Sequence, residues 1–342
     1  MHHDSSRDFL RFHDLGADAI LSIIARAQVL AAAWQDRSMP QSLAGKRIAL
    51  IADDGGWRNT TAFDLGVKAM GGICVQPPVR FNVHETTADL AGYLDNWFDI
   101  LVVRTRELAT LHELAAHAAA PVVNARTRAN HPCETLGDLA YASGKRGTLE
   151  GLKVVGVAPD ANILRSWVEA SIALPIEVIQ LYPADWHIRD IASPRFTAST
   201  DLDALRDADV IVTDCWPGEA HNDQLWGYRI SAALLDTCRR DAIFLPCPPV
   251  TRGPGGHGGC NDPRHMPEHG GQGFPSARPE RPAGMDRRVA VQDGSLDHLP
   301  ILAAALNLRC CREMTQRQNQ QRSGLHTQVV VHPHVHLRIA ID

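Results

Sequence analysis

The chain has 342 residues, enough for two domains of ordinary size, and 44% of them are hydrophobic, so it can bury a sizeable core. We find no apolar run of membrane-spanning length, so no membrane partner is expected, and the net charge of -5 argues against nucleic acid as the main partner. The first residues carry no export signal and the eight cysteines show no metal-ligand spacing, so we expect a cytoplasmic protein without a metal site.

Helix and strand patterns alternate through the first half of the chain. Apolar residues at helical spacing predict an amphipathic helix between Asp8 and Trp34. Short apolar runs and further helical patterns follow it. The predicted strands cover residues 47–52, 73–76, 99–103 and 121–124, and the predicted helices between them cover residues 62–70, 86–97 and 108–119. This alternation predicts a parallel sheet with helices on both of its faces.

The same alternation returns in the second half. The predicted helices cover residues 135–143, 162–173, 201–207 and 231–239, and the predicted strands cover residues 153–157, 176–181, 209–213 and 242–245. We therefore predict an α/β fold of two doubly wound parallel-sheet domains joined by a helical hinge. The predicted boundaries give a first domain of residues 1–134, a second domain of residues 135–253, and a tail of residues 254–342.

His131 lies between the predicted strand that ends at Asn124 and the helical pattern that begins near Thr135. Open α/β sheets bind their ligands at this edge, so His131 is a candidate site residue. The plainer interpretation is a histidine in an ordinary turn beside Pro132, and the local sequence taken alone favours it.

The segment from Asp53 to Thr61 connects the first predicted sheet strand to a helix and contains two glycines. Free backbone N–H groups at such a helix start, with Arg58 and the hydroxyls of Thr60 and Thr61, can form a phosphate-binding site. The alternative is an ordinary turn in which Thr60 or Thr61 caps the helix. Arg104, at the end of its strand, is a second candidate because it would point into the ligand crevice.

The segment from Gly156 to Ala161 loosely resembles a dinucleotide-binding turn. Alanines stand where that turn needs glycines, and Pro159 would crowd it. We therefore expect no nicotinamide or other cofactor.

Five short motifs occur in the order in which one known family has them. They are Val103-Arg-Thr105, Pro121-Val-Val-Asn124, His131-Pro-Cys-Glu134 with Leu136-Gly-Asp-Leu139, Thr213-Asp-Cys-Trp216, and Pro246-Cys-Pro-Pro249 with Arg252-Gly253. The order and spacing resemble the aspartate/ornithine carbamoyltransferases, especially the ornithine branch, from Phe9 to Gly253. The resemblance implies two α/β domains, a homotrimer, and transfer of a carbamoyl group from carbamoyl phosphate to an amino-acid amine.

The resemblance also implies roles for individual residues. Arg104 and His131 would face the carbonyl and phosphate oxygens, and Cys247 would help to deprotonate the attacking amine. Asp214 would hold the amines of the amino acid and Asn162 its carboxylate region. The remaining implied substrate-binding residues are Arg58, on the phosphate, and Asn59, Thr60, Thr61, Glu134 and Arg252.

Three departures from the family pattern affect the reacting groups. The family's Ser-Thr-Arg-Thr-Arg loop reads Gly56-Trp-Arg-Asn-Thr60, a glutamine is replaced by Glu134, and a histidine is replaced by Pro246. A carboxylate beside a dianionic phosphate is costly in a low-dielectric site. Three functions therefore remain open: an amino-acid carbamoyltransferase, a family member that uses another amine or acyl phosphate, and a non-catalytic homologue.

The tail has a different composition from the rest of the chain. Between Pro254 and Asp286, fourteen of thirty-three residues are Gly or Pro, which is typical of a disordered linker. We prefer a reading-frame shift near Pro254, because GC-rich codons read one base out of register yield segments that resemble the family's closing part. The last 89 residues would then be non-native, and their eight histidines would form no metal site. A gene that encodes no such family segment in another frame would refute this hypothesis.

Overall fold

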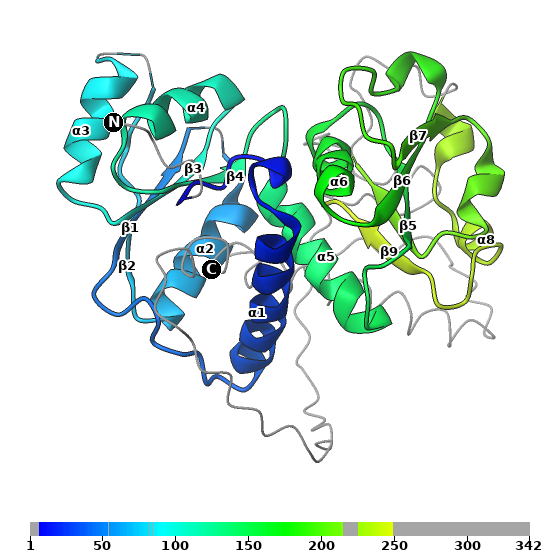
Figure 1. Cartoon of the computed structure of the whole chain (residues 1–342), viewed down its shortest axis with the longest axis horizontal. Helices are drawn as coiled ribbons and strands as arrows, with labels where there is room; N and C mark the ends of the chain where they lie inside the picture. Colours follow the sequence, from blue (N-terminus) through cyan, green and yellow to red (C-terminus); the bar gives the residue numbers. More distant parts are fainter. Residues whose placement is uncertain (1–6, 54, 82, 84, 215–224, 249–342) are drawn as a thin grey trace, which may run out of the picture.

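The computed structural model describes residues 7–53, 55–81, 83, 85–214 and 225–248. Within these residues the chain forms two α/β units that lie side by side, with helix α5 between them (Figure 1). The predicted tail, residues 254–342, and Arg252 lie outside the described residues, so the hypothesis of a frame shift stays a prediction.

The first unit is built on a four-stranded parallel sheet. Its strand order is β2-β1-β3-β4. The strands are β1 (Arg47–Ala52), β2 (Ile73–Val75), β3 (Ile100–Arg104) and β4 (Val122–Arg126), and the helices are α1 (Ala17–Gln35), α2 (Trp57–Ala69), α3 (Thr87–Asp95) and α4 (Leu108–His117). The predicted alternation of strand and helix is confirmed, with small shifts at the ends of the elements.

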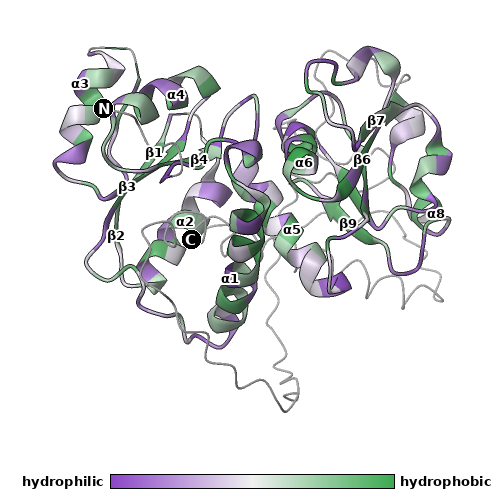
Figure 2. Ribbon diagram, viewed as in Figure 1, coloured by the Kyte–Doolittle hydropathy of each residue, from purple (hydrophilic) through white to green (hydrophobic). Residues whose placement is uncertain are grey.

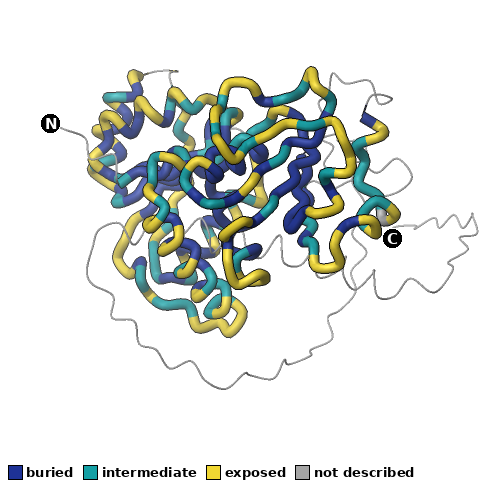
Figure 3. Tube along the Cα trace, turned by 45° about the vertical axis from the view of Figure 1, so that its right-hand side comes forward, coloured by how far each residue is buried: buried dark blue, intermediate teal, exposed yellow. Residues whose placement is uncertain are grey.

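Alternate residues of β1 face two different hydrophobic cores. Ile48 and Leu50 belong to the core that contains α1, α2 and α5. Ala49 and Ile51 belong to the core that contains α3 and α4. Because successive side chains of a strand point to opposite faces, this pattern shows that helices cover both faces of the sheet. Figure 3 shows buried segments in the interior and more exposed segments around them.

The predicted start of the first helix, at Asp8, is wrong. The chain before α1 forms a parallel bridge to β4, in which the Phe9 N–H donates to Val122 O at 2.9 Å. A 3-10 turn at Phe12–Asp14 follows, and α1 begins only after Gly16, which is extended. Pairing with the edge of β4 therefore overrides the local helical pattern.

Helix α1 is long and apolar enough to cross a membrane by length and composition, with a mean hydropathy of 1.4, contrary to our expectation (Figure 2). A core helix of a soluble protein passes the same test. One face of α1 is buried in the core, where Ile20, Ile24 and Leu30 are at most 3% exposed. Packing against the sheet and α5 accounts for the apolar residues of this face, while only 22% of the apolar window of α1 is buried.

The second unit holds a five-stranded parallel sheet with the order β7-β6-β5-β8-β9. The strands are β5 (Leu152–Val157), β6 (Ile176–Leu181), β7 (Phe196–Ser199), β8 (Val210–Thr213) and β9 (Ile243–Pro246), and the helices are α5 (Pro132–Arg146), α6 (Asn162–Ala173) and α8 (Ala232–Leu235). The prediction missed β7, a short edge strand without a fully buried residue. The predicted helix 201–207 is only a 3-10 turn, Leu202–Leu205.

The predicted helix at residues 231–239 shrinks to the four residues of α8. After it the chain turns, and both the N–H and the hydroxyl of Thr237 donate to Leu234 O. A threonine that bonds the backbone in this way competes with the helical pattern.

Helix α5 joins the two units. It ends at Gly147, whose φ of 81° is a left-handed conformation that favours glycine. The core that contains α1 and α5 continues through Val154 of β5 and Trp167 of α6. The two sheets therefore share one continuous core across α5. The predicted domain boundary at residue 134 falls inside this helix and stays a prediction.

Candidate functional site

The carboxyl end of β3 places Arg104 against the backbone of Gly56. Gly56 has a φ of 88°, and a Cβ atom on it would lie 2.4 Å from the Arg104 guanidinium carbon. The segment after β1 is tied to the same strand end, because the Asp53 N–H donates to Arg104 O and the Thr105 hydroxyl donates to Asp53 Oδ2 at 2.6 Å. In this arrangement a side chain at position 56 and the observed position of Arg104 exclude each other.

Helix α2 begins at Trp57, five residues earlier than predicted. Its N-cap is Gly56, whose left-handed backbone turns the chain directly into the helix. The expectation that Thr60 or Thr61 caps the helix is therefore wrong. Thr60 lies within the first turns and its hydroxyl donates to Trp57 O at 3.2 Å.

The structure places Arg58 on the exposed surface of α2. Its guanidinium carbon lies 4.9 Å from the ring centre of Trp57, in a cation–π contact, and the Trp57 residue is 65% exposed. Thr61 is exposed as well. Asn59 differs from them, because its Oδ1 is buried and has no hydrogen-bond partner among the described residues. The predicted phosphate-binding residues are thus adjacent on one helix end, but Arg58 points along its own helix surface.

His131 is buried at the N-cap of α5, where it is only 6% exposed. Its backbone N–H donates to the Ser166 hydroxyl at 2.7 Å, which ties it to the second unit. Its Nε2 lies 3.0 Å from Glu134 Oε2, and its Nδ1 is buried without a hydrogen-bond partner in the described structure. Pro132 at the first helical position favours this abrupt helix start, because its missing N–H needs no partner there.

Glu134 connects the first sheet to the second. Its Oε1 lies 3.9 Å from the thiol of Cys247, just after β9, and the Cys247 N–H donates to Thr213 O at 3.2 Å. Burial alone would raise the pKa of Glu134, but the charges of His131 and Arg104 and the hydrogen bond from Cys247 outweigh it and lower the pKa. The structure thus brings together three predicted catalytic residues, Arg104, His131 and Cys247, around one carboxylate.

Asp214 follows β8 at the carboxyl end of the second sheet and is 7% exposed. It lies directly after Thr213, the residue that accepts the N–H of Cys247. Burial, and then the charge of Asp214, raise the pKa of the nearby Tyr182. Asp214 is therefore next to the strand end that leads to Cys247, and its role of holding the amines of the amino acid stays a prediction.

One face of α6 carries polar residues that form hydrogen bonds with the segment before α5. Asn162 donates from Nδ2 to Thr127 O at 2.7 Å, and Ser166 accepts from His131. Glu169 accepts from Asn130 Nδ2 at 3.2 Å. The prediction used Asn162 only for substrate and missed the other two, although positions 162, 166 and 169 share a helical face.

Glu169 also accepts the backbone N–H of Phe12 at 3.3 Å and is 5% exposed. Burial raises its pKa from 4.5 to about 7, although hydrogen bonds from Asn130 and Phe12 oppose the change. Glu169 thus joins the N-terminal segment, the second unit and the residue that precedes His131.

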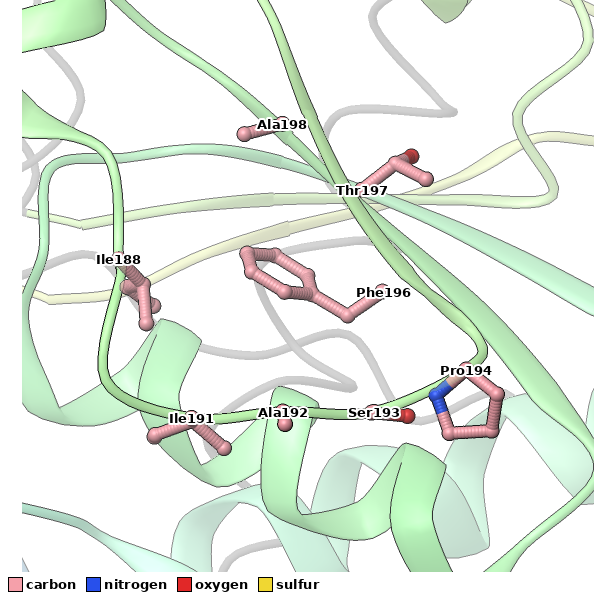
Figure 4. Close-up of a pocket in the computed structure, with 8 residues that line it drawn as sticks. All are labelled: Ile188, Ile191, Ala192, Ser193, Pro194, Phe196, Thr197 and Ala198. Carbon is pink, nitrogen blue, oxygen red and sulfur yellow. The ribbon is translucent and has the colours of Figure 1, made fainter.

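The pocket in Figure 4 lies elsewhere, beside the edge strand β7. Its lining residues are Ile188, Ile191, Ala192, Ser193, Pro194, Phe196, Thr197 and Ala198. None of these side chains is charged, so this pocket lacks the groups that an anionic substrate needs. The chemistry therefore points to the strand ends around Glu134.

Two parallel-sheet units are joined by a helix that begins at a buried histidine, and a carboxylate and a thiol lie beside that histidine. The chain is thus a two-domain α/β protein whose candidate site lies where the two sheets meet. Residues 7–143 match the family described as "Aspartate/ornithine carbamoyltransferase, carbamoyl-P binding domain". The chain belongs to the aspartate/ornithine carbamoyltransferase family, as the sequence motifs implied.

Similar proteins include the ornithine carbamoyltransferase of Nitrobacter winogradskyi, which is 35% identical over 229 residues, or 62% of this chain and 74% of that protein. The ornithine carbamoyltransferase of Rhodopseudomonas palustris is 32% identical over 278 residues, or 74% of this chain and 87% of that protein. Among solved structures, the ornithine carbamoyltransferase of Pyrococcus furiosus superposes with a TM-score of 0.70 at 25% identity, covering 77% of this chain and 90% of that one. The predicted fold is thereby confirmed.

Proposed function

We propose that this protein transfers a carbamoyl group from carbamoyl phosphate to the amine of an amino acid, with an ornithine-like acceptor. The observation that carries the proposal is the meeting of Arg104, His131 and Cys247 around the first turn of α5. The similar proteins named above, which are ornithine carbamoyltransferases, support the same reaction.

The proposed reaction follows from where charge develops. The neutral amine attacks the carbonyl carbon, negative charge builds on the carbonyl oxygen, and phosphate leaves with the electrons of the broken C–O bond. We assign Arg104 and His131 to these oxygens, because preorganised cationic donors stabilise such charge in a water-poor site. We assign Cys247 to proton removal from the amine in its thiolate form, after it has given up the proton that it donates to Glu134, with Asp214 as the carboxylate that holds the amino-acid amines.

The phosphate end is assigned to the start of α2. Its backbone N–H groups and the positive end of the helix dipole favour an anion, and Arg58, Asn59, Thr60 and Thr61 all lie in its first turns. Arg58 would have to leave its contact with Trp57 to reach the donor. One N–H of the Asn162 amide is already used by Thr127 O, so its second N–H and its oxygen remain for the acceptor.

The test is a direct assay of the full chain. Carbamoyl phosphate is supplied with ornithine and then with a panel of other amino-acid amines, and the ureido product and released phosphate are measured together. Formation of both with one acceptor supports the proposal. A folded chain that forms neither with any acceptor contradicts it.

The pair of His131 and Glu134 favours a second candidate. A carboxylate 3.0 Å from the proposed donor imidazole suits a family member that takes another acyl phosphate or another amine. The same assay with acetyl phosphate separates this candidate from the first. If no donor gives a product, the chain is a non-catalytic homologue.

We also propose that the protein is a cytoplasmic homotrimer. Family resemblance supports the trimer, and Ile73 and Val75 on the edge strand β2 are large exposed apolar residues suited to contact between copies. Cys74 and Cys133 are free thiols among the described residues, and they support a reducing compartment. Light scattering after size exclusion measures the number of copies.

A further inference from the structure

Glu134 places a carboxylate among the groups that the proposed function assigns to the donor. Its Oε2 lies 3.0 Å from His131 Nε2 and its Oε1 lies 3.9 Å from Cys247 Sγ. The charge of Arg104 also acts on it. The side chain of Glu134 is 19% exposed, so it is largely shielded from solvent. These contacts are those that an anionic ligand of the site would make.

The contact with Glu134 occupies Nε2 of His131, the ring nitrogen that would otherwise bind the donor. While Nε2 faces Glu134, the only other ring nitrogen, Nδ1, is buried without a hydrogen-bond partner in the described structure. A donor oxygen can therefore reach the imidazole through Nε2 only when the carboxylate moves aside. His131 cannot serve both anions through one N–H.

We propose that Glu134 is an internal counter-anion that competes with the phosphate of the donor for His131 and Arg104, and so sets a low affinity of the site for phosphate. The inference rests on the proposed function, because it takes the site around Arg104 to be the donor site. The carboxylate of Glu134 offsets the positive charge of Arg104 and takes up the ring nitrogen that His131 presents to the site. A dianionic phosphate then meets a site of lower net positive charge, and it must displace Glu134 to bind.

Another role for Glu134 predicts the opposite result. If the carboxylate accepted N–H groups of the donor's carbamoyl amide, its replacement by glutamine would remove a charge-assisted hydrogen bond and weaken binding of carbamoyl phosphate. Inorganic phosphate has no N–H groups at any pH, so it cannot make the hydrogen bonds that the carbamoyl amide would make to Glu134.

The experiment is calorimetric titration of the full chain with inorganic phosphate at alkaline pH, where phosphate is a dianion. The variants are Glu134→Gln, which keeps the shape of the side chain, and Glu134→Ala. The matched control is Glu113→Gln, which removes an equal charge from an exposed position on α4. We expect both Glu134 variants to bind phosphate tighter by on the order of tenfold or more, and Glu113→Gln to bind it as the parent chain does. Unchanged or weaker binding by folded Glu134 variants overturns the proposal.

A second measurement uses the unaltered chain. The imidazole nitrogen resonances of His131 are followed by nuclear magnetic resonance while phosphate is added. We expect them to shift as phosphate replaces Glu134, with the same midpoint as the calorimetric binding. Binding of phosphate without any shift at His131 overturns the proposal even if a Glu134 variant fails to fold.

The outcomes separate this inference from the proposed function. Tighter phosphate binding in the variants of a chain that forms no ureido product supports the counter-anion and refutes the transferase. If the chain forms product and the Glu134 variants bind phosphate with the same affinity as the parent chain, the result supports the transferase and refutes the counter-anion.

Discussion

The first turn of α5 and the middle of α6 each hold a carboxylate that is largely shielded from solvent, and their surroundings shift the two pKa values in opposite directions. Burial raises the pKa of both, but at Glu134 the charges of His131 and Arg104 and a hydrogen bond from Cys247 more than reverse the effect. At Glu169 the hydrogen bonds come from the neutral amide of Asn130 and from a backbone N–H, and burial prevails. The charge of the partners, more than the depth of burial, therefore decides the charge of a buried carboxylate.

The two carboxylates hold neighbouring parts of one segment. Glu169 binds Asn130, and Glu134 binds His131, the next residue. The segment that leads into α5 is thus held by an ionised group on its own helix and by a group on α6 that titrates near neutral pH. Glu134 belongs to the proposed catalytic site, and Glu169 to the contact between the two units.

The largest expected effect comes from removing one of the positive charges that act on Glu134. Arg104→Gln removes a charge that acts on Glu134 and a donor for the developing oxyanion. We expect the carbamoyl transfer rate to fall by about 10²–10³-fold and the pKa of Glu134 to rise. Steady-state kinetics and a pH titration of Glu134 by carbon-13 resonance measure the two effects.

The control for Arg104→Gln is Arg47→Gln. Arg47 lies at the amino end of β1 and pairs with Asp99 at 3.3 Å, on the sheet edge opposite to the site. It should leave the rate unchanged. Equal losses in the two variants would show that Arg104 has no special role.

The second prediction concerns stability against pH. The folded pKa of Glu169, about 7, is above its ordinary value of 4.5, so its contribution to stability is complete below pH 4.5 and is lost as the pH rises through about 7. This loss is on the order of 3 kcal/mol. Glu169→Gln should remove that part of the pH dependence in urea unfolding, whereas the exposed Glu150→Gln should retain it. An unchanged slope in Glu169→Gln would show that the carboxyl is not the titrating group.

The third prediction separates positioning of His131 from general stability. Ser166→Ala leaves the buried N–H of His131 without its acceptor, which costs about 1–3 kcal/mol of unfolding free energy. We expect kcat to fall as well, because His131 is no longer fixed against α6. Ser171→Ala, on the same helix, also removes a buried hydroxyl with hydrogen bonds at 2.7 and 2.9 Å, but should spare kcat. If both variants lose kcat equally, Ser166 has only a structural role.

The smallest expected effect concerns the turn that holds Arg104. Gly56→Ala adds a Cβ 2.4 Å from the Arg104 guanidinium carbon at a φ of 88°, and should cost about 1–2 kcal/mol of stability and lower kcat. Gly55→Ala adds a Cβ at a φ of 52° with nothing within 4 Å, so it should lose stability without losing kcat. Thermal unfolding and kinetics of the pair test this. Equal kcat in both variants would contradict a dependence on the place of Arg104.

The order of strands and helices was predictable from the sequence because buried parallel strands form short apolar runs between amphipathic helices. The starts of α1 and α2 were not, since one is set by pairing of Phe9 with Val123 and the other by the left-handed backbone of Gly56. Both causes lie outside the hydrophobic periodicity on which the prediction rested.

The site was predictable to the extent that its residues lie at strand ends. Arg104, His131 and Cys247 end or follow strands, and the carboxyl ends of parallel strands meet at one edge. Ser166 and Glu169 were missed because their partners, His131 and Asn130, are more than thirty residues away in the sequence. The predicted position of Arg58 on the phosphate gained no support, since its contact with Trp57 is local.

The most direct test of the central claim, that the carboxyl edges of both sheets form one donor site, is alkylation of the thiols followed residue by residue by mass spectrometry. Cys247 lies in the proposed site, whereas Cys74 lies on β2 at the outer edge of the first sheet. We predict that carbamoyl phosphate slows alkylation of Cys247 and leaves the rate at Cys74 unchanged. Alkylation of Cys247 at the same rate with and without carbamoyl phosphate, at concentrations that saturate the transfer reaction, would contradict the account.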